Sequence, residues 1–187
     1  MNLFFLSTSP KGCVVVCDKH IVKMPLETAQ MLYTAHHLQP SSEKWKNSAP
    51  ENFYRKTHTN HPVAVWVRLC RANYSFAASV GMELCYEYTR RYKRVHACQS
   101  HLEWLYNNHP CFTSPVIPET YKHKYFATEG LCEGCTKFPL AMPDNFYHRD
   151  VRIAYRRYLS SDNKAKFSKW NYSKTPLWFI IMRSRMI

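Results

Sequence analysis

The segment from Asp18 to Leu38 constrains the fold most, because its polar and apolar residues separate onto opposite sides of a helix. At about 100° per residue, the polar side chains form one stripe roughly 100° wide. Asp18 is placed to cap the first turn, and Pro25 should kink the helix because it removes one backbone hydrogen bond. The pattern predicts a long helix whose stripe either faces solvent or forms the wall of a site. The stripe contains His20, Lys23, Glu27, Gln30, Thr34 and His37.

Composition and charge restrict the classes of function. The chain has 187 residues, of which 45% are hydrophobic, and this suits one domain spanning residues 1–187 with a buried core. A net charge of +13 and 15% aromatic residues favour a nucleic acid as partner over a membrane, because cations neutralise phosphates and rings stack on bases. Only four glycines occur, and neither GxGxxG nor GxxxxGK[ST] is present, which argues against a phosphate-binding loop.

Hydropathy and cysteine usage bear on location. The apolar run at residues 3–6 is too short for a signal peptide, and no run approaches the roughly 18 residues of a membrane span. We therefore expect an intracellular protein that is not secreted. Eight cysteines without a secretion signal suggest reduced thiols or a metal site, not disulfides. The sequence leaves the oligomeric state open.

The periodicity predicts a mainly α fold, namely a compact single-domain helical bundle of five to seven helices. A short extended segment opens the chain at residues 2–6, and the segment at 11–17 suits a helix or a strand. Further helices are expected at residues 63–71, 73–91 and 100–107, from Asp144 or Asn145 to Leu159, and from residue 161. Residues 109–146 form a long, irregular, proline-rich insertion, residues 176–179 an extended segment, and residues 180–187 a tail.

The segment YRKTHTNHP at residues 54–62 concentrates basic and histidine side chains. His58 and His61 would share one face of a helix, where they could ligate a metal or contact a phosphate. No carboxylate lies nearby in sequence to complete a metal site, so phosphate or base contact is favoured. The alternative is a polar loop in which Asn60 caps the next helix and Pro62 lies near its start.

Basic clusters elsewhere suggest phosphate contacts, and nearby aromatic residues suggest base stacking. At the end of the 73–91 helix, the alternative is that cations offset the helix dipole. Tyr33, Trp66 and Tyr92 are candidates for stacking on a base. The predicted nucleic-acid-binding residues are Arg55, Lys56, His58, Asn60, Trp66, Arg90, Arg91, Tyr92, Lys93, Arg94, Arg149, Arg152, Arg156 and Arg157.

Two pairs of cysteines have spacings that could serve a metal. Cys132 and Cys135 form a CxxC knuckle, which could bind zinc with two further ligands or remain as free thiols. Cys13 and Cys17 lie one helical turn apart and fit the core better than a metal site. The sequence requires no cofactor, and zinc at Cys132 and Cys135 is the one that it suggests.

Three blocks carry a resemblance to a known family: CDKHIVKMPLETAQMLYTAH at 17–36, NHPVAVW at 60–66 and CYEYTRRYKRVH at 85–96. With the closing FSKWNYSKTPLWF, the chain resembles, nearly end to end, a family of small proteins from tailed phages and large DNA viruses. Some members of that family are labelled pyrimidine-dimer DNA glycosylases. The resemblance implies a viral setting and a role in nucleic-acid metabolism. Pro25 and an insertion at 125–138 depart from the family pattern.

Three functions are consistent with these features. The first is an enzyme acting on a base or nucleotide in DNA or RNA, glycosylase- or lyase-like or base-modifying, with His20, Lys23, Glu27 and His61 as catalytic residues. The second is a non-catalytic DNA- or RNA-binding protein associated with chromatin or packaging. The third is a His-dependent nuclease using His58, His61, Glu83 and Glu87.

Overall fold

The computed structural model describes residues 1–39, 43–112 and 123–185. The chain is 53% helical, with eight α-helices and one two-stranded sheet among these residues, so the expected mainly α fold is confirmed. The helices are α1 (Pro10–Cys13), α2 (Asp18–Leu38), α3 (Pro62–Val67), α4 (Arg71–Tyr92), α5 (Gln99–Asn107), α6 (Val151–Ser160), α7 (Asp162–Ala165) and α8 (Leu177–Ser184).

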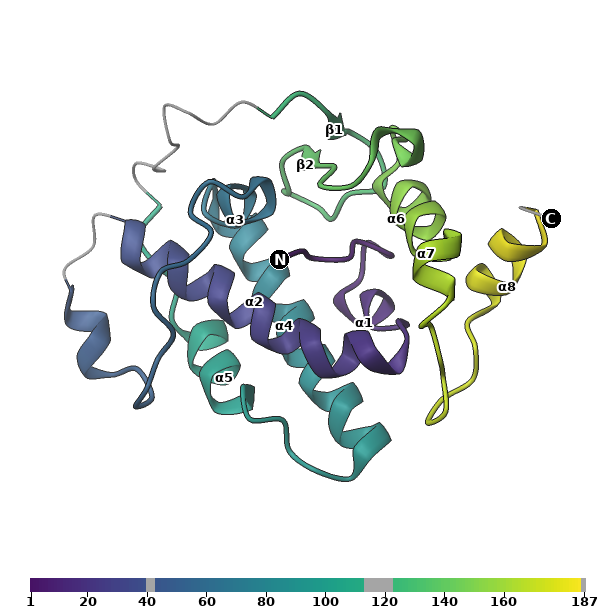
Figure 1. Ribbon diagram of the computed structural model, residues 1–187. Coiled ribbons are helices and arrows are strands. Elements are labelled where there is room, and N and C mark those ends of the chain that lie inside the picture. Colours follow the sequence, from purple (N-terminus) through teal and green to yellow (C-terminus); the bar gives the residue numbers. More distant parts are fainter. Residues whose placement is uncertain (40–42, 113–122, 186–187) are drawn as a thin grey trace.

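Helices α2 and α4 form the centre of the molecule, and α5 packs beside both of them (Figure 1). Helix α2 has the predicted bounds and continues through Pro25. The expectation that Asp18 caps α2 is wrong, because Cys17 occupies the N-cap position and the Asp18 carboxylate turns to Arg91 of α4 instead. The apolar side of α2 joins a buried cluster that extends along the chain from Leu3 to Leu159.

The N-terminal segment runs extended beside α2, as expected, with Leu3 to Leu6 buried. The ring of Phe5 stacks on Phe76 of α4 at a centroid distance of 4.5 Å and meets Phe138 edge-on at 5.3 Å. Residues 10–13 form the short helix α1, and Cys13 and Cys17 are both buried, which confirms their placement in the core.

The described part of the 109–146 segment is largely irregular, but it contains a small hairpin that the periodicity did not predict. Strand β1 (Phe126–Ala127) pairs antiparallel with β2 (Phe138–Pro139), so that Ala127 lies opposite Phe138. Part of the segment, residues 113–122, falls outside the described residues. The position of the hairpin is set by Phe138 of β2, which is buried. Its ring packs on that of Trp66 in α3 with 4.8 Å between the ring centroids.

The C-terminal elements differ in their bounds from the prediction. Asp144–Phe146 forms a separate 3-10 turn, and α6 begins only at Val151, where the Asp150 carboxylate accepts from the Arg152 amide. The extended segment predicted at 176–179 and the tail predicted at 180–187 are wrong, because α8 spans most of both. Helix α8 packs on α6 at the outer edge of the molecule (Figure 1). None of the described helices is both long enough and apolar enough to span a membrane.

Gly81 lies where α4 approaches α2 and α5 most closely. A Cβ atom at this position would lie 2.6 Å from Leu102 Cδ2 and 3.0 Å from Thr28 Cγ2. The glycine costs about 1 kcal/mol of helix propensity relative to alanine, so close packing is the reason for its presence.

We predict that Gly81→Val lowers the free energy of unfolding by about 2 kcal/mol, because two extra branches meet Thr28 and Leu102 in a filled core. Gly81→Ala should cost less, because the Leu102 side chain can shift. Urea denaturation measures both values, with Ser100→Val on the exposed side of α5 as a control. A Gly81→Val protein as stable as the wild type would contradict the assignment.

Candidate functional site

The first half of the predicted polar stripe lines a cavity of about 380 Å³ beside the N-terminal segment. His20, Lys23 and Glu27 of α2 form one wall. Residues from the N-terminus, from the segment after β2 and from the α6–α7 region form the others, namely Met1, Asn2, Phe4, Ala141, Tyr158, Lys164 and Phe167. The stripe is therefore the wall of a site over its first half, as one of the two sequence interpretations proposed.

Glu27 is the only acidic side chain among the residues that line this cavity, and it is 8% exposed. Its carboxylate lies 2.9 Å from Lys23 Nζ and 3.7 Å from the amino nitrogen of Met1. The backbone N–H of Asn2 donates to Glu27 Oε2 at 2.8 Å. A carboxylate so far removed from water needs such partners to remain charged.

His20 is held as a neutral imidazole. Burial lowers the pKa of His20 to about 4, and the nearby charge of Lys164 acts in the same direction. The rings of Phe4 and Phe167 meet the imidazole edge-on at 4.7 and 5.6 Å, and Cys17 Sγ lies 3.3 Å from its Nδ1. At neutral pH, His20 is therefore uncharged and can accept or donate a hydrogen bond.

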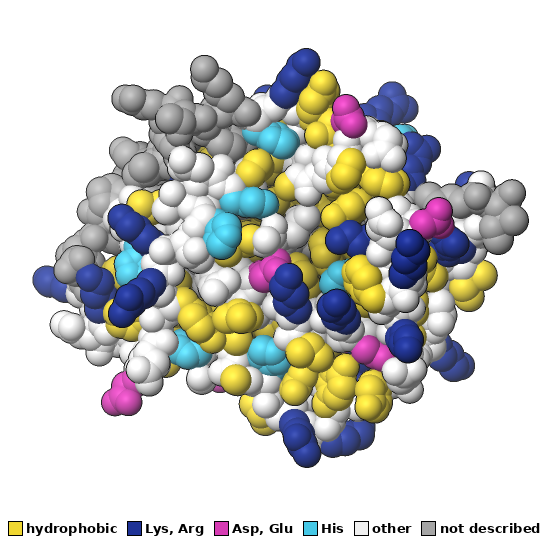
Figure 2. All heavy atoms as spheres, viewed as in Figure 1, with side chains coloured by type: hydrophobic (Ala, Val, Ile, Leu, Met, Phe, Trp, Pro, Cys, Tyr) yellow, Lys and Arg dark blue, Asp and Glu magenta, His cyan; other side chains and the backbone are white. Residues whose placement is uncertain are grey.

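Cations surround the cavity. Lys19, Lys23 and Lys164 line it, and the ammonium of Lys164 lies over the ring of Tyr158 at 4.8 Å. Figure 2 shows basic side chains gathered around an acidic one near the middle of this face, with histidines close by. The cavity thus combines one carboxylate with an excess of positive charge and aromatic walls.

The second half of the stripe has a structural role. Thr34 Oγ1 accepts from the Thr57 amide at 3.1 Å, and His37 Nε2 lies 3.1 Å from the Tyr54 carbonyl. These bonds fix the loop that leads to α3. Over this half the stripe is neither the solvent-facing surface nor the site wall of the two sequence interpretations, because Thr34 and His37 bond to the backbone of a neighbouring segment.

The histidines at 58 and 61 do not share a helical face, as the metal interpretation required. They flank a turn in which the His61 amide donates to the His58 carbonyl, and His58 has a left-handed φ of 49°. His61, not Asn60, caps α3, since its Nδ1 accepts from the Val63 amide at 3.3 Å. Burial and the amino group of Met1 lower the pKa of His61 to about 4, but His61 does not line the cavity.

Several predicted contacts with nucleic acid are not available in this structure. Trp66 and Tyr33 are fully buried, so neither can stack on an extruded base. The side chain of Arg91 is 2% exposed and binds Glu87 and Asp18 at 2.6 and 2.9 Å. Arg91 therefore joins two helices and cannot serve in the phosphate-binding patch predicted from TRRYKRVH.

The remaining residues predicted to bind nucleic acid are cations with partners in the protein, aromatic and turn residues, and exposed cations. Arg90, Arg149 and Arg152 each pair with an acidic residue, and Arg156 donates to the Leu6 carbonyl. Tyr92 is partly buried against Tyr88 and Tyr172, and Asn60 and His58 are exposed on the residue-60 turn. The cations that are exposed and have no ion pair among the described residues are Arg55, Lys56, Lys93, Arg94 and Arg157.

Cys132 and Cys135 form a disulfide, so the expectation of reduced thiols or a metal in place of disulfides is wrong for this pair. Within residues 1–39, 43–112 and 123–185, no group of three or more His, Cys, Asp or Glu side chains is placed to hold a metal ion. Zinc at the CxxC pair remains a prediction for the dithiol form alone, because a disulfide offers no thiolate.

The sequence interpretation missed half of the cavity. Lys164, Tyr158 and Phe167 come from the far end of the chain, and Phe167 meets α2 directly, with its ring 5.6 Å from that of His20 and 4.7 Å from Lys19 Nζ. Lys19 lies on the same helix at the same angle as His37, but it was not among the residues assigned to the stripe. No local pattern marks the three distant residues, because a tertiary contact brings them to the site.

We predict that Arg91→Met lowers the free energy of unfolding by about 3–5 kcal/mol, because it leaves Asp18 and Glu87 without their buried partner. Arg90→Met removes a cation whose side chain is 58% exposed and should cost under about 1 kcal/mol. Chemical denaturation of the two variants provides the comparison. Equal losses would show that Arg91 is not the joint between α2 and α4.

His20 gives a prediction about pH. Its native pKa of about 4 lies below the ordinary histidine value of 6.5, so only the unfolded chain gains this proton as the pH falls from 6.5 to 4. Stability should therefore decline across that window, and an NMR titration of the imidazole should show it neutral at pH 5.5. His20→Gln should remove part of the decline and retain the part due to His36, whose pKa burial also lowers to about 4. An imidazole that titrates near 6.5 would contradict the burial of His20.

Comparisons with family models, curated proteins and solved structures found no match to this chain. The resemblance to phage and viral proteins therefore stays a prediction, and the functional argument depends on the cavity.

Proposed function

We propose that the protein processes a base or nucleotide in DNA or RNA, by glycosylase- or lyase-like chemistry, at the cavity around Glu27. The observation that carries the proposal is a carboxylate of 8% exposure with an amine on either side of it, Lys23 Nζ at 2.9 Å and the Met1 nitrogen at 3.7 Å. Buried acids paired with amines also occur in purely structural ion pairs, and here the cavity beside the group favours a functional role.

An amine next to a carboxylate has the groups that removal of a base requires. The neutral amine attacks the anomeric carbon of the nucleotide, the bond to the base breaks, and the base leaves with the bonding electrons and takes up a proton. The carboxylate stabilises the positive charge that develops on the sugar and accepts a proton from the amine. The product is an imine between the amine and the opened sugar, which water hydrolyses or which eliminates the 3′ phosphate.

The surroundings of the cavity support a polyanionic substrate. Lys19, Lys23 and Lys164 supply positive charge at its wall, within a chain of net charge +13. His20 supplies a neutral proton acceptor or donor, and Tyr158 and Phe167 offer ring surface to a base. A volume of about 380 Å³ is in the range of sites for single small molecules.

The test is incubation with duplex and single-stranded DNA and RNA that contain uracil, a pyrimidine dimer or an abasic site, followed by borohydride reduction. Borohydride converts the imine into a stable amine, so the adduct appears as a band of higher mass. We expect Lys23→Met to abolish the Lys23 adduct and Glu27→Gln to slow its formation by roughly 10²–10⁴-fold. Peptide mapping then identifies which of the two amines reacted.

Lys44→Met and Glu103→Gln are matched controls, because both residues are exposed and neither lines the cavity. They should trap substrate at the wild-type rate. An adduct that survives in Lys23→Met and maps to Met1 would keep the chemistry and assign the other amine. The absence of any adduct or abasic product on all of these substrates would overturn the proposal.

A second candidate, a non-catalytic nucleic-acid-binding protein, is favoured by the exposed cations Lys93, Arg94 and Arg157. In that case affinity falls steeply with salt, and Glu27→Gln and His20→Ala bind like the wild type with no product formed. The nuclease hypothesis has less support, because Glu87 is engaged by Arg90 and Arg91 and is not grouped with His58 and His61.

A further inference from the structure

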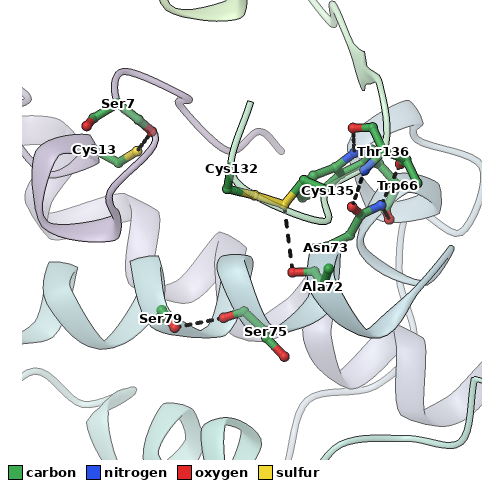
Figure 3. The surroundings of a disulfide bond; sticks show 10 residues. All are labelled: Ser7, Cys13, Trp66, Ala72, Asn73, Ser75, Ser79, Cys132, Cys135 and Thr136. Carbon is green, nitrogen blue, oxygen red and sulfur yellow. Dashed lines mark hydrogen bonds between the residues drawn. A yellow bond between two sulfur atoms is a disulfide. The ribbon is translucent and has the colours of Figure 1, made fainter. Parts of the chain in front are cut away.

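The disulfide lies in the turn between β1 and β2, away from the cavity (Figure 3). The Cys135 amide donates to the Cys132 carbonyl at 3.2 Å, and Gly134 takes a left-handed φ of 71°. This turn alone places the two Cα atoms 5.4 Å apart, within the range that a disulfide requires. The backbone therefore holds the sulfurs in position whether or not they are bonded.

Both ends of the cysteine turn are fixed to the rest of the protein by other bonds. On the Cys135 side, the Thr136 amide donates to Asn73 Oδ1 at 2.9 Å, and Trp66 Nε1 donates to the Thr136 carbonyl at 3.2 Å. On the Cys132 side, the Val151 amide donates to the Glu129 carbonyl at 3.0 Å. Figure 3 shows Asn73 and Trp66 converging on Thr136 next to the disulfide.

The bond therefore contributes little to holding the fold. A disulfide stabilises mainly by restricting the unfolded chain, and this restriction is smallest when the closed loop is short. Here only two residues, Glu133 and Gly134, separate the cysteines, and both are exposed. A structural staple would join distant segments, whereas this bond spans a turn that is already formed.

We propose that Cys132 and Cys135 form a redox-active pair, which exchanges between disulfide and dithiol with thiol reductants while the protein stays folded. This inference is independent of the chemistry proposed at Glu27. It assigns a second reactive site, on the loop of the hairpin, whose substrates are low-molecular-weight thiols or the dithiols of other proteins.

The exchange balances with two equivalents of thiol. A thiolate attacks Cys132 Sγ, the sulfur farther from α4 in Figure 3, and forms a mixed disulfide while Cys135 leaves and takes up a proton. A second thiol attacks the mixed disulfide, releases Cys132 and leaves as the oxidised reductant. The released Cys135 thiol can then donate to the Ala72 carbonyl 3.9 Å away, a bond that needs the proton absent from the disulfide.

The test equilibrates the native protein in buffers of reduced and oxidised glutathione and counts alkylated thiols by mass. We expect the reduced fraction of the pair to rise from about one tenth to about nine tenths when the square of the reduced glutathione concentration, divided by the concentration of the oxidised form, rises about a hundred-fold. This is the behaviour of a two-electron couple. The reduction rate should rise in proportion to thiol concentration, and the melting temperature of the reduced protein should fall by only a few degrees. Cys111→Ser serves as the background, because Cys111 is an exposed cysteine outside the pair whose alkylation would add to the count.

Gly134→Ala supplies a variant that keeps both sulfurs. Alanine is strained at a φ of 71°, and the strain relaxes more readily in the dithiol, so the equilibrium should shift roughly five-fold or more toward the dithiol. Three outcomes would overturn the proposal. They are a pair that resists reduction until the protein unfolds, a reduction rate that saturates at the rate of unfolding, and thiols that never oxidise in the native protein.

Discussion

The orientation of α2 on α4 is the constraint on which the candidate site depends. Arg91 of α4 binds Asp18 in the first turn of α2, and the same carboxylate accepts from the Asn171 amide at 2.6 Å. Farther along, Gly81 lets α4 approach Thr28 closely. Two contacts separated along a helix fix its rotation about its own axis, and that rotation directs Glu27 into the cavity and its apolar neighbours into the core.

A carboxylate in this position is costly, and its partners explain how the fold tolerates it. Glu27 loses most of its water and regains hydrogen bonds and charge from Lys23, from the Asn2 amide and from the Met1 nitrogen. A pair of apolar residues would fill the same space at lower cost. The Asp18–Arg91–Glu87 group has the same chemistry, but its cation, Arg91, is 2% exposed and joins α2 to α4, so its role is structural. The two groups differ in accessibility. The Glu27 carboxylate lines a cavity, whereas the Arg91 guanidinium is buried between two helices.

The sequence predicted the fold to different depths in different segments. Helix α2 was predicted to the residue, because 21 residues of strong amphipathic period leave one solution. Local patterns could not show that Trp66 is buried or that Arg91 is paired, since both outcomes depend on residues such as Thr136 and Asp18 that lie far along the chain. In the same way, His20, Lys23 and Glu27 were identified from one helix, whereas Lys164 of α7 and Phe167, just after it, reach the cavity through tertiary contacts.

The hairpin connects the two reactive sites without coupling them mechanically. Ala141, just beyond β2, lines the cavity and accepts from Asn2 Nδ2 at 3.3 Å, whereas Cys135 lies just before β2. Between them, Thr136 is held by Asn73, and the fully buried ring of Phe138 is wedged among Phe5, Trp66 and Tyr155. A change at the sulfurs would have to move a buried aromatic ring to reach Ala141, and a filled core resists that displacement. The packing of Phe138 therefore lets a redox-active turn and a charged cavity share one short segment while each keeps its own chemistry.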